Sequence, residues 1–188
     1  MRIVAGKHRG RALLVPESPA IRPTSDRARE ALFNILEHGS FAAGGSRLAE
    51  KRVLDAFAGT GALGLEALSR GARHVSFIEQ ASEARKLLAR NIAALGEQER
   101  TTVLPGDATA PSRALAPVAL ALLDPPYGKG LGAKALTALA AAGWFAPDTL
   151  IVLEIGAKEM PALPDGFTLR DDRRYGAARL LFIETSPA

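Results

Sequence analysis

The sequence predicts an α/β protein built on a mostly parallel β-sheet with an antiparallel edge near the C-terminal end. Apolar runs of strand length alternate with helical segments between residues 52 and 156. This alternation is typical of a parallel sheet whose two faces are covered by helices. Residues 167–185, "FTLRDDRRYGAARLLFIET", read as two strands joined by a short turn, which predicts a terminal antiparallel hairpin.

Each element of this fold is expected at a defined place, from apolar periodicity and from bounding Gly, Pro and polar residues. Strands are expected at residues 52–56, 73–79, 101–107, 117–124 and 149–156. Helices are expected at residues 27–37, from the glycine turn after residue 56 to about residue 71, at 82–96 and at 132–144. Ser82 is the expected cap of the third helix.

The segment before these repeats has a different character. Residues 3–15 predict a hairpin with a basic tip at Lys7-His8-Arg9-Gly10. Prolines then prevent regular structure as far as Pro23. Thr24 or Ser25 is expected to cap the first helix, and a glycine-rich connector follows that helix. The apolar face of the helix is expected to comprise Ala28, Ala31, Leu32, Ile35 and Leu36.

Composition narrows the class of protein. The 188 residues, 47% of them apolar, predict a single domain over residues 1–188, with a basic hairpin and arm over residues 1–24. No apolar run approaches the roughly 20 residues of a membrane span, and Met1 leads into an expected strand rather than a signal peptide. The absence of cysteine excludes disulfides and agrees with a cytoplasmic protein. The three histidines lie far apart, so no metal site is expected.

Positive charge is concentrated at the N-terminal end. Residues 1–29 carry a net charge of +5, whereas the remaining 159 residues carry −1. A basic arm on a nearly neutral body suggests a polyanionic partner. Charge alone also fits a solvated tail that contributes only to solubility.

A glycine-rich turn follows the first strand of the repeat, in "LDAFAGTGALGLEAL". Its glycines let the backbone approach a ligand and let the next helix pack closely. Asp55 stands just before them, where a carboxylate would repel phosphate but suits an ammonium group. The pattern therefore favours the amino-acid part of S-adenosylmethionine (SAM) over NAD, and a tight turn without ligand is the alternative.

Acidic residues also close the following strands. Glu79 lies 24 residues after Asp55, an offset at which an acid commonly holds ribose hydroxyls. Asp107 can accept a hydrogen bond from an adenine amine, and Asp124 closes the fourth strand. Open α/β sheets bind ligands at the carboxyl ends of their strands, so these four acids predict one ligand site.

The motif Asp124-Pro125-Pro126-Tyr127 forms a stiff bracket, because each proline fixes its own backbone and restricts the preceding residue. It matches the (Asp/Asn/Ser)-Pro-Pro-(Tyr/Phe) motif of methyltransferases that modify exocyclic amines of bases. The Asp124 carboxylate and the Pro125 carbonyl would accept the two amine hydrogens. Tyr127 would stack on the extruded base.

The chain resembles the RsmD-type 16S rRNA guanine-N2 methyltransferases over nearly its whole length. The resemblance is carried by "MRIVAGKHRGRALLVP", "IRPTSDRAREALFNIL", "LDAFAGTGALGLEALSRGA", "LLDPPY" and "YGAARLLF". It implies a Rossmann-like class I SAM-dependent methyltransferase with a seven-stranded sheet and an N-terminal β-hairpin that meets RNA. It also implies transfer to guanine N2 of 16S rRNA. The expected partner is 16S rRNA within a small-subunit ribosomal particle. The protein is expected to bind it as a monomer and to have no membrane partner.

Site residues follow from the motifs and from this resemblance. The catalytic residues expected are Asp124, Pro125, Pro126 and Tyr127. The cofactor-binding residues expected are Asp55, Phe57, Ala58, Gly59, Thr60, Gly61, Glu79, Asp107, Ala108 and Asp124. The RNA-binding residues expected are Lys7, Arg9, Arg11, Arg22, Thr24 and Arg27.

Two other functions fit the same motifs. DNA adenine-N6 methyltransferases share the Asp-Pro-Pro-Tyr motif, but they usually carry a target-recognition domain for which 188 residues leave no room. A non-catalytic rRNA-binding assembly factor could keep SAM as a structural ligand, although the intact bracket disfavours it. A protein glutamine methyltransferase would normally show Asn in place of Asp124.

Overall fold

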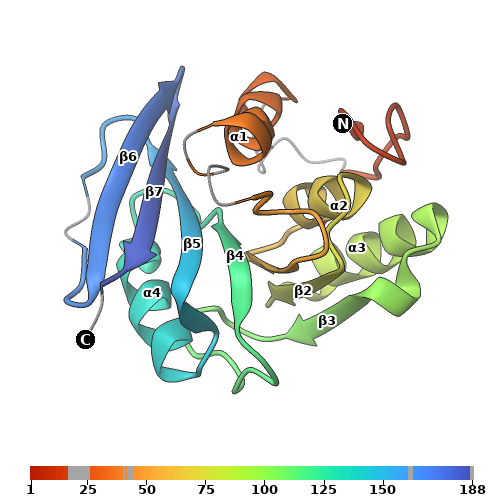
Figure 1. Ribbon diagram of the computed structural model, residues 1–188. Helices are drawn as coiled ribbons and strands as arrows, with labels where there is room; N and C mark the ends of the chain where they lie inside the picture. Colours follow the sequence, from red (N-terminus) through yellow and green to blue (C-terminus); the bar gives the residue numbers. More distant parts are fainter. Residues whose placement is uncertain (17–25, 40, 42–44, 161–162, 187–188) are drawn as a thin grey trace.

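The computed structural model describes residues 1–16, 26–39, 41, 45–160 and 163–186, with backbone only at residues 26 and 27. Its centre is a seven-stranded sheet in the order β3-β2-β1-β4-β5-β7-β6 (Figure 1). The strands are β1 Arg52–Ala56, β2 His74–Glu79, β3 Thr101–Pro105, β4 Val118–Leu123, β5 Phe145–Gly156, β6 Phe167–Tyr175 and β7 Ala178–Thr185. The first five strands are mutually parallel, whereas β7 runs antiparallel to both β5 and β6. The predicted fold is confirmed.

Helices cover both faces of this sheet (Figure 1). Helices α1 (Asp26–His38), α2 (Ala62–Ser69) and α3 (Ser82–Leu95) share one apolar core with the sheet, and α4 (Leu131–Ala141) belongs to the core on the other face. A short 3₁₀ turn, η2 (Gln98–Arg100), leads into β3. None of these described helices is long and apolar enough to cross a bilayer.

The two cores follow directly from strand periodicity. Along β4, Leu120 and Leu122 join the core under α1–α3, while Ala121 and Leu123 join the core under α4. A strand buried on both faces needs apolar side chains at consecutive positions. The continuous run "VALALL" supplies them, so the sheet is sealed on both sides and polar groups are left to its edges.

The N-terminal segment forms a minimal hairpin. One antiparallel bridge pairs Arg2 with Ala12, and the Ile3 amide donates to the Arg11 carbonyl at 3.0 Å. The two strands expected over residues 3–15 are therefore reduced to this single bridge. Gly6 lies so close to α2 that a Cβ there would be 1.9 Å from the Ser69 carbonyl oxygen. The hairpin thus depends on contact with the sheet domain rather than on its own ladder.

Three sequence predictions need correction. Ser82 is the first helical residue of α3 and Ala81 is the N-cap, which makes no side-chain cap bond. Strand β3 ends at Pro105, two residues before the expected end. Strand β5 begins at Phe145, four residues early, because the exposed Pro147-Asp148 pair obscured its first half. The proposed caps Thr24 and Ser25 lie outside the described residues.

Candidate active site

The carboxyl edge of the parallel sheet brings the predicted acids together. Asp55 lies near the end of β1, Glu79 ends β2, and Asp124 directly follows β4, which pairs with β1. The Asp124 amide contacts the Ala56 carbonyl oxygen at 3.4 Å, which ties the start of the Asp-Pro-Pro-Tyr bracket to β1. The edge also lies at the β1/β4 reversal of strand order, where open sheets form ligand crevices.

Asp55 is a buried carboxylate whose Oδ2 accepts a hydrogen bond from the Gly64 amide at 2.8 Å. Burial raises its pKa well above the usual value near 3.8, the bond from Gly64 lowers it, and the charges of Asp124 and Glu79 raise it further. Three mutually repelling carboxylates make this edge electronegative. A cationic ligand group placed beside them would relieve the repulsion.

Glu79 holds the glycine-rich loop in place. Its Oε2 accepts from the Gly59 amide at 2.8 Å, and its Oε1 accepts from the Ala81 amide at 2.7 Å. A carboxylate has further lone pairs, so these bonds leave room for ribose hydroxyls. Phe57, with φ 62°, occupies the left-handed region that is costly for a non-glycine residue. The loop is therefore held by its neighbours in a shape that it would not adopt alone.

Close packing fixes two of the loop's glycines. A Cβ at Gly61 would lie 2.3 Å from Leu88 Cδ1, and one at Gly64 would lie 2.3 Å from Phe77 Cε1. At Gly59, in contrast, nothing lies within 4 Å of a Cβ, and its φ of 55° is the constraint. Ala58 and Thr60 are buried beside these residues. Gly59 is thus the position at which the loop backbone faces open space.

The loop after β3 carries the next predicted acid. Asp107 is half-buried, and its Oδ1 accepts from the Thr109 amide at 2.8 Å, which closes an Asx turn. Ala108 is buried in the core on the α4 side. The turn fixes the Asp107 carboxylate beyond the end of β3, on the same edge as Glu79.

The Asp-Pro-Pro-Tyr bracket has a partner that the sequence did not reveal. The Tyr127 hydroxyl donates to Oε1 of Glu154 at 2.5 Å, and Glu154 is buried at the end of β5. Burial and this carboxylate raise the pKa of Tyr127 above its usual value. Tyr127 remains 44% exposed, so its hydroxyl is anchored while its ring faces solvent. Glu154 could have been suspected as an acid inside the apolar run "LIVLEIG".

Glu159 is a second acid that the sequence analysis did not identify, and it supports the segment that follows the bracket. Glu159 Oε1 accepts from the Gly128 amide at 3.0 Å and from the Gly156 amide at 3.2 Å. A Cβ at Gly156 would lie 2.7 Å from Glu159 Oε1, so this glycine lets the Glu159 carboxylate approach the backbone. A shallow hollow that is open to solvent is lined by Pro125, Pro126, Tyr127, Gly130, Glu154 and Glu159. The bracket therefore borders a recess beside the acidic edge.

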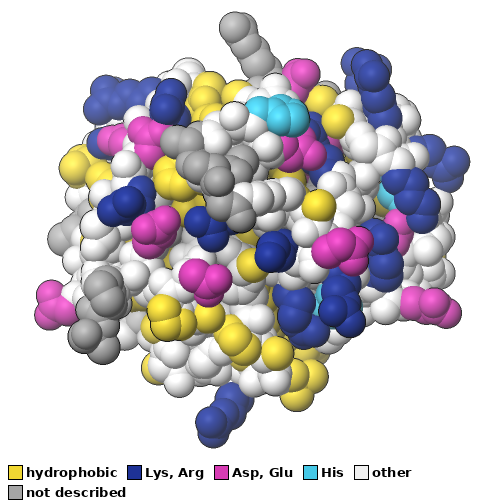
Figure 2. All heavy atoms as spheres, in the orientation of Figure 1, with side chains coloured by type: hydrophobic (Ala, Val, Ile, Leu, Met, Phe, Trp, Pro, Cys, Tyr) yellow, Lys and Arg dark blue, Asp and Glu magenta, His cyan; other side chains and the backbone are white. Residues whose placement is uncertain are grey.

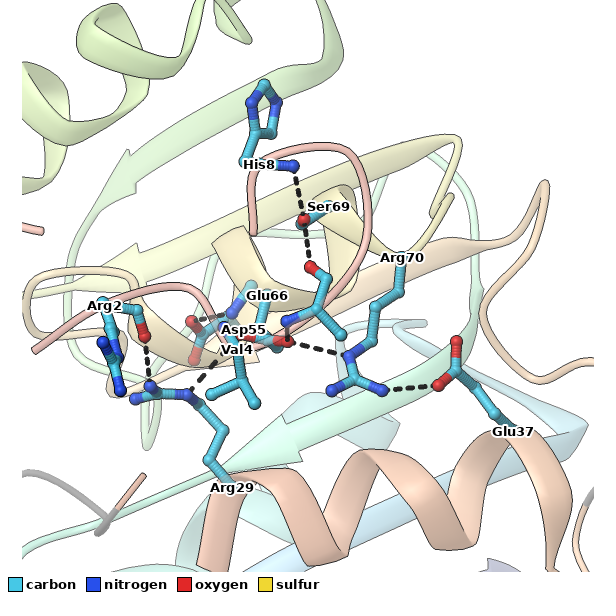
Figure 3. Close-up of polar contacts among 11 residues, drawn as sticks. Arg2, Val4, His8, Arg29, Glu37, Asp55, Glu66, Ser69 and Arg70 are labelled. Atoms are coloured by element: carbon cyan, nitrogen blue, oxygen red, sulfur yellow. Dashed lines mark hydrogen bonds and ion pairs between the residues drawn. The ribbon is translucent and has the colours of Figure 1, made fainter. Parts of the chain in front are cut away.

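The N-terminal hairpin is fastened to α2 by the buried carboxylate of Glu66 (Figure 3). Glu66 accepts from the Val4 amide at 2.8 Å and from the Ala5 amide at 3.0 Å. Arg29 is fully buried, with Nη2 2.5 Å from the Arg2 carbonyl and Nε 3.7 Å from Glu66 Oε2. One of the positive charges of residues 1–29 is therefore internal, neither solvated nor available to RNA.

The same carboxylate extends the network to α1. Arg70 Nε donates to Glu66 Oε1 at 2.8 Å, and Arg70 Nη1 donates to Glu37 at 2.5 Å (Figure 3). The Arg70 guanidinium also lies 5.0 Å from the centre of the Phe33 ring. The network joins hairpin, α1 and α2 as one buried polar unit.

Asn91 connects the hairpin to the glycine-rich loop. Its Oδ1 accepts from the Leu14 amide at 2.8 Å, and its Nδ2 donates to the Leu14 carbonyl at 3.1 Å and to the Thr60 carbonyl at 3.0 Å. Asn91 is buried on α3, and its bond to the Thr60 carbonyl is fully buried. The segment leading out of the hairpin and the proposed cofactor loop therefore share one side chain.

The predicted RNA-binding residues fall into two groups. Lys7 and Arg9 are exposed near the hairpin tip, and Lys7 Nζ lies 3.3 Å from Glu97 Oε1. Arg11 is exposed and donates to the Ala94 carbonyl at 2.9 Å. The others, Arg22, Thr24 and the Arg27 side chain, lie outside the described residues.

The sheet order and the glycine-rich loop at an acidic carboxyl edge define the class: a Rossmann-like fold of the class I methyltransferases. The solved structure of Escherichia coli protein yhhF is similar, with a TM-score of 0.82 and 32% identity, over 99% of this chain and 98% of that chain. An RNA methyltransferase from Salinibacter ruber in complex with S-adenosyl-L-homocysteine shares the fold, with a TM-score of 0.67 and 12% identity, over 89% and 95% of the two chains.

Within this class, the chain belongs to the conserved hypothetical protein 95 family, which matches residues 1–184. Ribosomal RNA small subunit methyltransferase D of Escherichia coli (strain K12) is 35% identical over 177 residues, which are 94% of this chain and 85% of that protein. The resemblance inferred from the sequence motifs is confirmed.

Proposed function

We propose that this protein is a SAM-dependent methyltransferase that methylates the exocyclic N2 amine of a guanine in 16S rRNA. The observation that carries the proposal is the Asp-Pro-Pro-Tyr bracket, tied to β1 through Asp124 and to β5 through Tyr127, beside a cluster of buried acids. The name of the E. coli relative supports a small-subunit rRNA substrate.

The acidic edge fits the cofactor. SAM, when bound, supplies an activated methyl group on a positively charged sulfur. Asp55 would hold its ammonium group, Glu79 its ribose hydroxyls and Asp107 its adenine amine. The raised pKa of Asp55 indicates a carboxylate that gains from a nearby cation. Gly59, open on its ligand-facing side, would allow close approach of the cofactor to the loop.

The bracket would orient the target amine. The Asp124 carboxylate and the Pro125 carbonyl each accept one amine hydrogen, which directs the nitrogen lone pair toward the methyl group. In the transfer, a new N–C bond would form as the S–C bond breaks, S-adenosylhomocysteine would be the second product, and the amine proton would pass to Asp124 or water. Because the prolines hold both acceptors in place, little reorganisation is needed during transfer.

Tyr127 would stack on the base. Its hydroxyl bond to Glu154 fixes the plane of the ring before the substrate arrives. An exocyclic amine can be reached only when the base leaves its stack, and an aromatic ring in a fixed position stabilises the extruded base. The proposal also includes binding as a monomer to rRNA in a small-subunit particle in the cytoplasm.

Incubation with methyl-labelled SAM and small-subunit rRNA, free or in particles, tests this function. Nucleoside analysis should yield N2-methylguanosine, and Asp124→Ala should greatly slow its formation while retaining S-adenosylhomocysteine binding. N6-methyladenosine as the product would assign adenine chemistry instead. Cofactor binding without transfer to any rRNA or particle would indicate a non-catalytic factor.

A further inference from the structure

The hairpin tip lies at the opposite edge of the sheet from the proposed active site. The Lys7 amide donates to the Ser69 carbonyl at 2.7 Å, and the His8 amide donates to Ser69 Oγ at 2.9 Å. Ser69 ends α2, and five residues later β2 begins. Since α2 leads from the carboxyl end of β1 to the amino end of β2, the tip is held at the amino edge.

Glu97 holds the tip from the neighbouring helix–strand connection. His8 Nε2 lies 2.6 Å from Glu97 Oε1, and Arg100 Nε lies 2.9 Å from Glu97 Oε2. Glu97 is buried, whereas the Lys7 side chain is 65% exposed. Arg100 directly precedes β3, so the tip and the start of that strand form one surface.

Three more cations continue this surface across the starts of β1 and β2. Lys51, Arg52 and Arg73 are all exposed. Arg52 is in register with His74, and the Arg73 amide donates to the Lys51 carbonyl at 2.8 Å, so the three lie together. Within the part of the chain that the structure describes, none of these three side chains forms an ion pair with a carboxylate. Burial and Arg52 lower the pKa of His74, so His74 adds little charge at neutral pH.

We infer that these six cations form an RNA-docking surface at the amino edge, separate from the carboxyl edge where the methyl transfer is proposed. The amino-edge basic surface comprises Lys7, Arg9, Lys51, Arg52, Arg73 and Arg100. Figure 2 shows Lys and Arg side chains gathered in a band toward the right of one face, where Figure 1 places the N-terminal segment and α3. This inference rests on the proposed rRNA substrate.

The chemistry of the surface selects its partner. Exposed Lys and Arg side chains bind phosphates by releasing condensed counterions. Lys7 and Arg100 share the Glu97 carboxylate, so Lys51, Arg52 and Arg73 are the side chains best placed for such contacts. Such contacts fix register and orientation rather than base identity. Strand β1 spans five residues, so the two edges are separated by about 16 Å along the strand direction. An RNA that reaches both edges must wrap around the protein, which a folded rRNA region of a ribosomal particle can do.

The test compares two double variants with the same loss of charge. Arg52→Ala/Arg73→Ala removes two cations of the surface. Lys134→Ala/Arg174→Ala removes two exposed cations of α4 and β6. All four side chains are exposed, so both variants should fold normally. Binding of 16S rRNA is measured across a salt series, alongside S-adenosylhomocysteine binding by calorimetry.

The surface variant should reduce the log–log salt slope by about 1.4–1.8, which corresponds to two phosphate contacts, and the control should change it far less. Cofactor affinity should stay at the wild-type value in both. Equal slopes in wild type and both variants would overturn the inference and leave the proposed function intact. Equal slopes on RNA combined with weakened binding to small-subunit particles would assign the surface to a protein partner and also overturn it. Failure of the wild type to bind or methylate rRNA would instead overturn the proposed function.

Discussion

The two edges of the central sheet differ in the sign of their charged side chains and in how far those side chains are buried. At the carboxyl edge, Asp55 and Glu79 are buried and each accepts hydrogen bonds from backbone amides. At the amino edge, Lys51, Arg52 and Arg73 are exposed and project from the first residues of strands or from the turns before them. The sheet therefore separates a rigid acidic site from a solvated basic surface.

The difference follows from what each edge is proposed to bind. A small cationic cofactor gains most from charges that are desolvated and held still, because reorganisation then costs little. A polyanion gains from many exposed cations, because counterion release needs no fixed geometry. Two buried side chains connect the N-terminal hairpin to the rest of the protein. Glu66 fastens the hairpin to α2, and Asn91 fastens the segment after the hairpin to the glycine-rich loop.

Removing the Glu66 carboxylate, which fastens the N-terminal hairpin to α2, should have the largest effect on stability. Glu66→Ala leaves Arg29 and Arg70 buried without their shared carboxylate, and the Val4 and Ala5 amides lose their acceptor. The free energy of unfolding should fall by about 3–5 kcal/mol. Urea unfolding measures this loss. Glu83→Ala, which removes an exposed partner of Lys86, is the control and should change stability by about 0.5 kcal/mol or less. Similar losses in both variants would contradict the anchoring role of Glu66.

Asp124→Ala should have the largest effect on chemistry. Loss of a preorganised acceptor for the target amine should slow transfer by about 10²–10³-fold, about 2.7–4 kcal/mol in activation free energy. Single-turnover methylation at saturating rRNA measures the rate. Calorimetry with S-adenosylhomocysteine should show that most cofactor affinity remains. Near-normal transfer would remove Asp124 from the chemistry.

Glu79→Ala should act on the cofactor and not on RNA. The variant loses the expected acceptor of the ribose hydroxyls and frees the Gly59 amide that shapes the loop. Affinity for S-adenosylhomocysteine should fall by about 1–3 kcal/mol, while the salt dependence of rRNA binding stays unchanged. Glu79→Gln, which keeps one acceptor oxygen, should lose less. Unaltered cofactor affinity in Glu79→Ala would exclude it from the site.

The two edges should respond to pH with opposite sign. Burial raises the pKa of Asp55, so the unliganded protein loses stability as pH rises from the unfolded-state value near 3.8 through the folded-state pKa. Burial by itself raises the pKa of Glu97. The bonds from His8 and Lys7 and the charge of Arg100 outweigh this effect, so the net pKa of Glu97 is lowered. Its contribution is therefore complete above the unfolded value near 4.5 and is lost as pH falls through the folded pKa.

Variants at these two positions make the difference measurable. Relative to wild type, Asp55→Asn should become increasingly stabilising as pH rises, and Glu97→Gln increasingly destabilising. The Glu97→Gln trend lies mainly below the unfolded value near 4.5, and the Asp55→Asn trend lies above the unfolded value near 3.8, so urea unfolding from about pH 2 to pH 8 measures both. Trends of the same sign in both variants would contradict the division between the edges.

Local pattern was enough to predict most of the fold and part of the site. The strands carry consecutive apolar residues, and their terminal acids Asp55 and Glu79 stand at positions that strand endings reveal. The bracket at Asp124 is contiguous in sequence and rigid by covalent geometry. The roles proposed for these acids stay predictions, while their placement on one edge is now a structural fact.

Partners that depend on tertiary packing could not be predicted in the same way. Glu154 meets Tyr127 across 27 residues, and Asn91 meets Leu14 across 77. Glu66 reads as an ordinary helix residue until α1 and the hairpin cover it. Arg29 contributes to the net charge of residues 1–29, which the sequence assigns to a solvated or polyanion-binding segment, yet it is fully buried. Buried polar contacts of this kind depend on which helices and strands pack against one another. A local sequence pattern carries no information about that packing.

Steady-state methylation of small-subunit particles by a crossed set of variants tests the division of the two edges most directly. The set comprises wild type, Asp124→Ala, Arg52→Ala/Arg73→Ala and the combination of all three substitutions. The account predicts that Asp124→Ala lowers kcat, that the arginine variant raises KM without lowering kcat, and that their free-energy effects on kcat/KM add within about 0.5 kcal/mol. A lowered kcat in the arginine variant, or strong non-additivity in the combination, would contradict separate roles for the two edges.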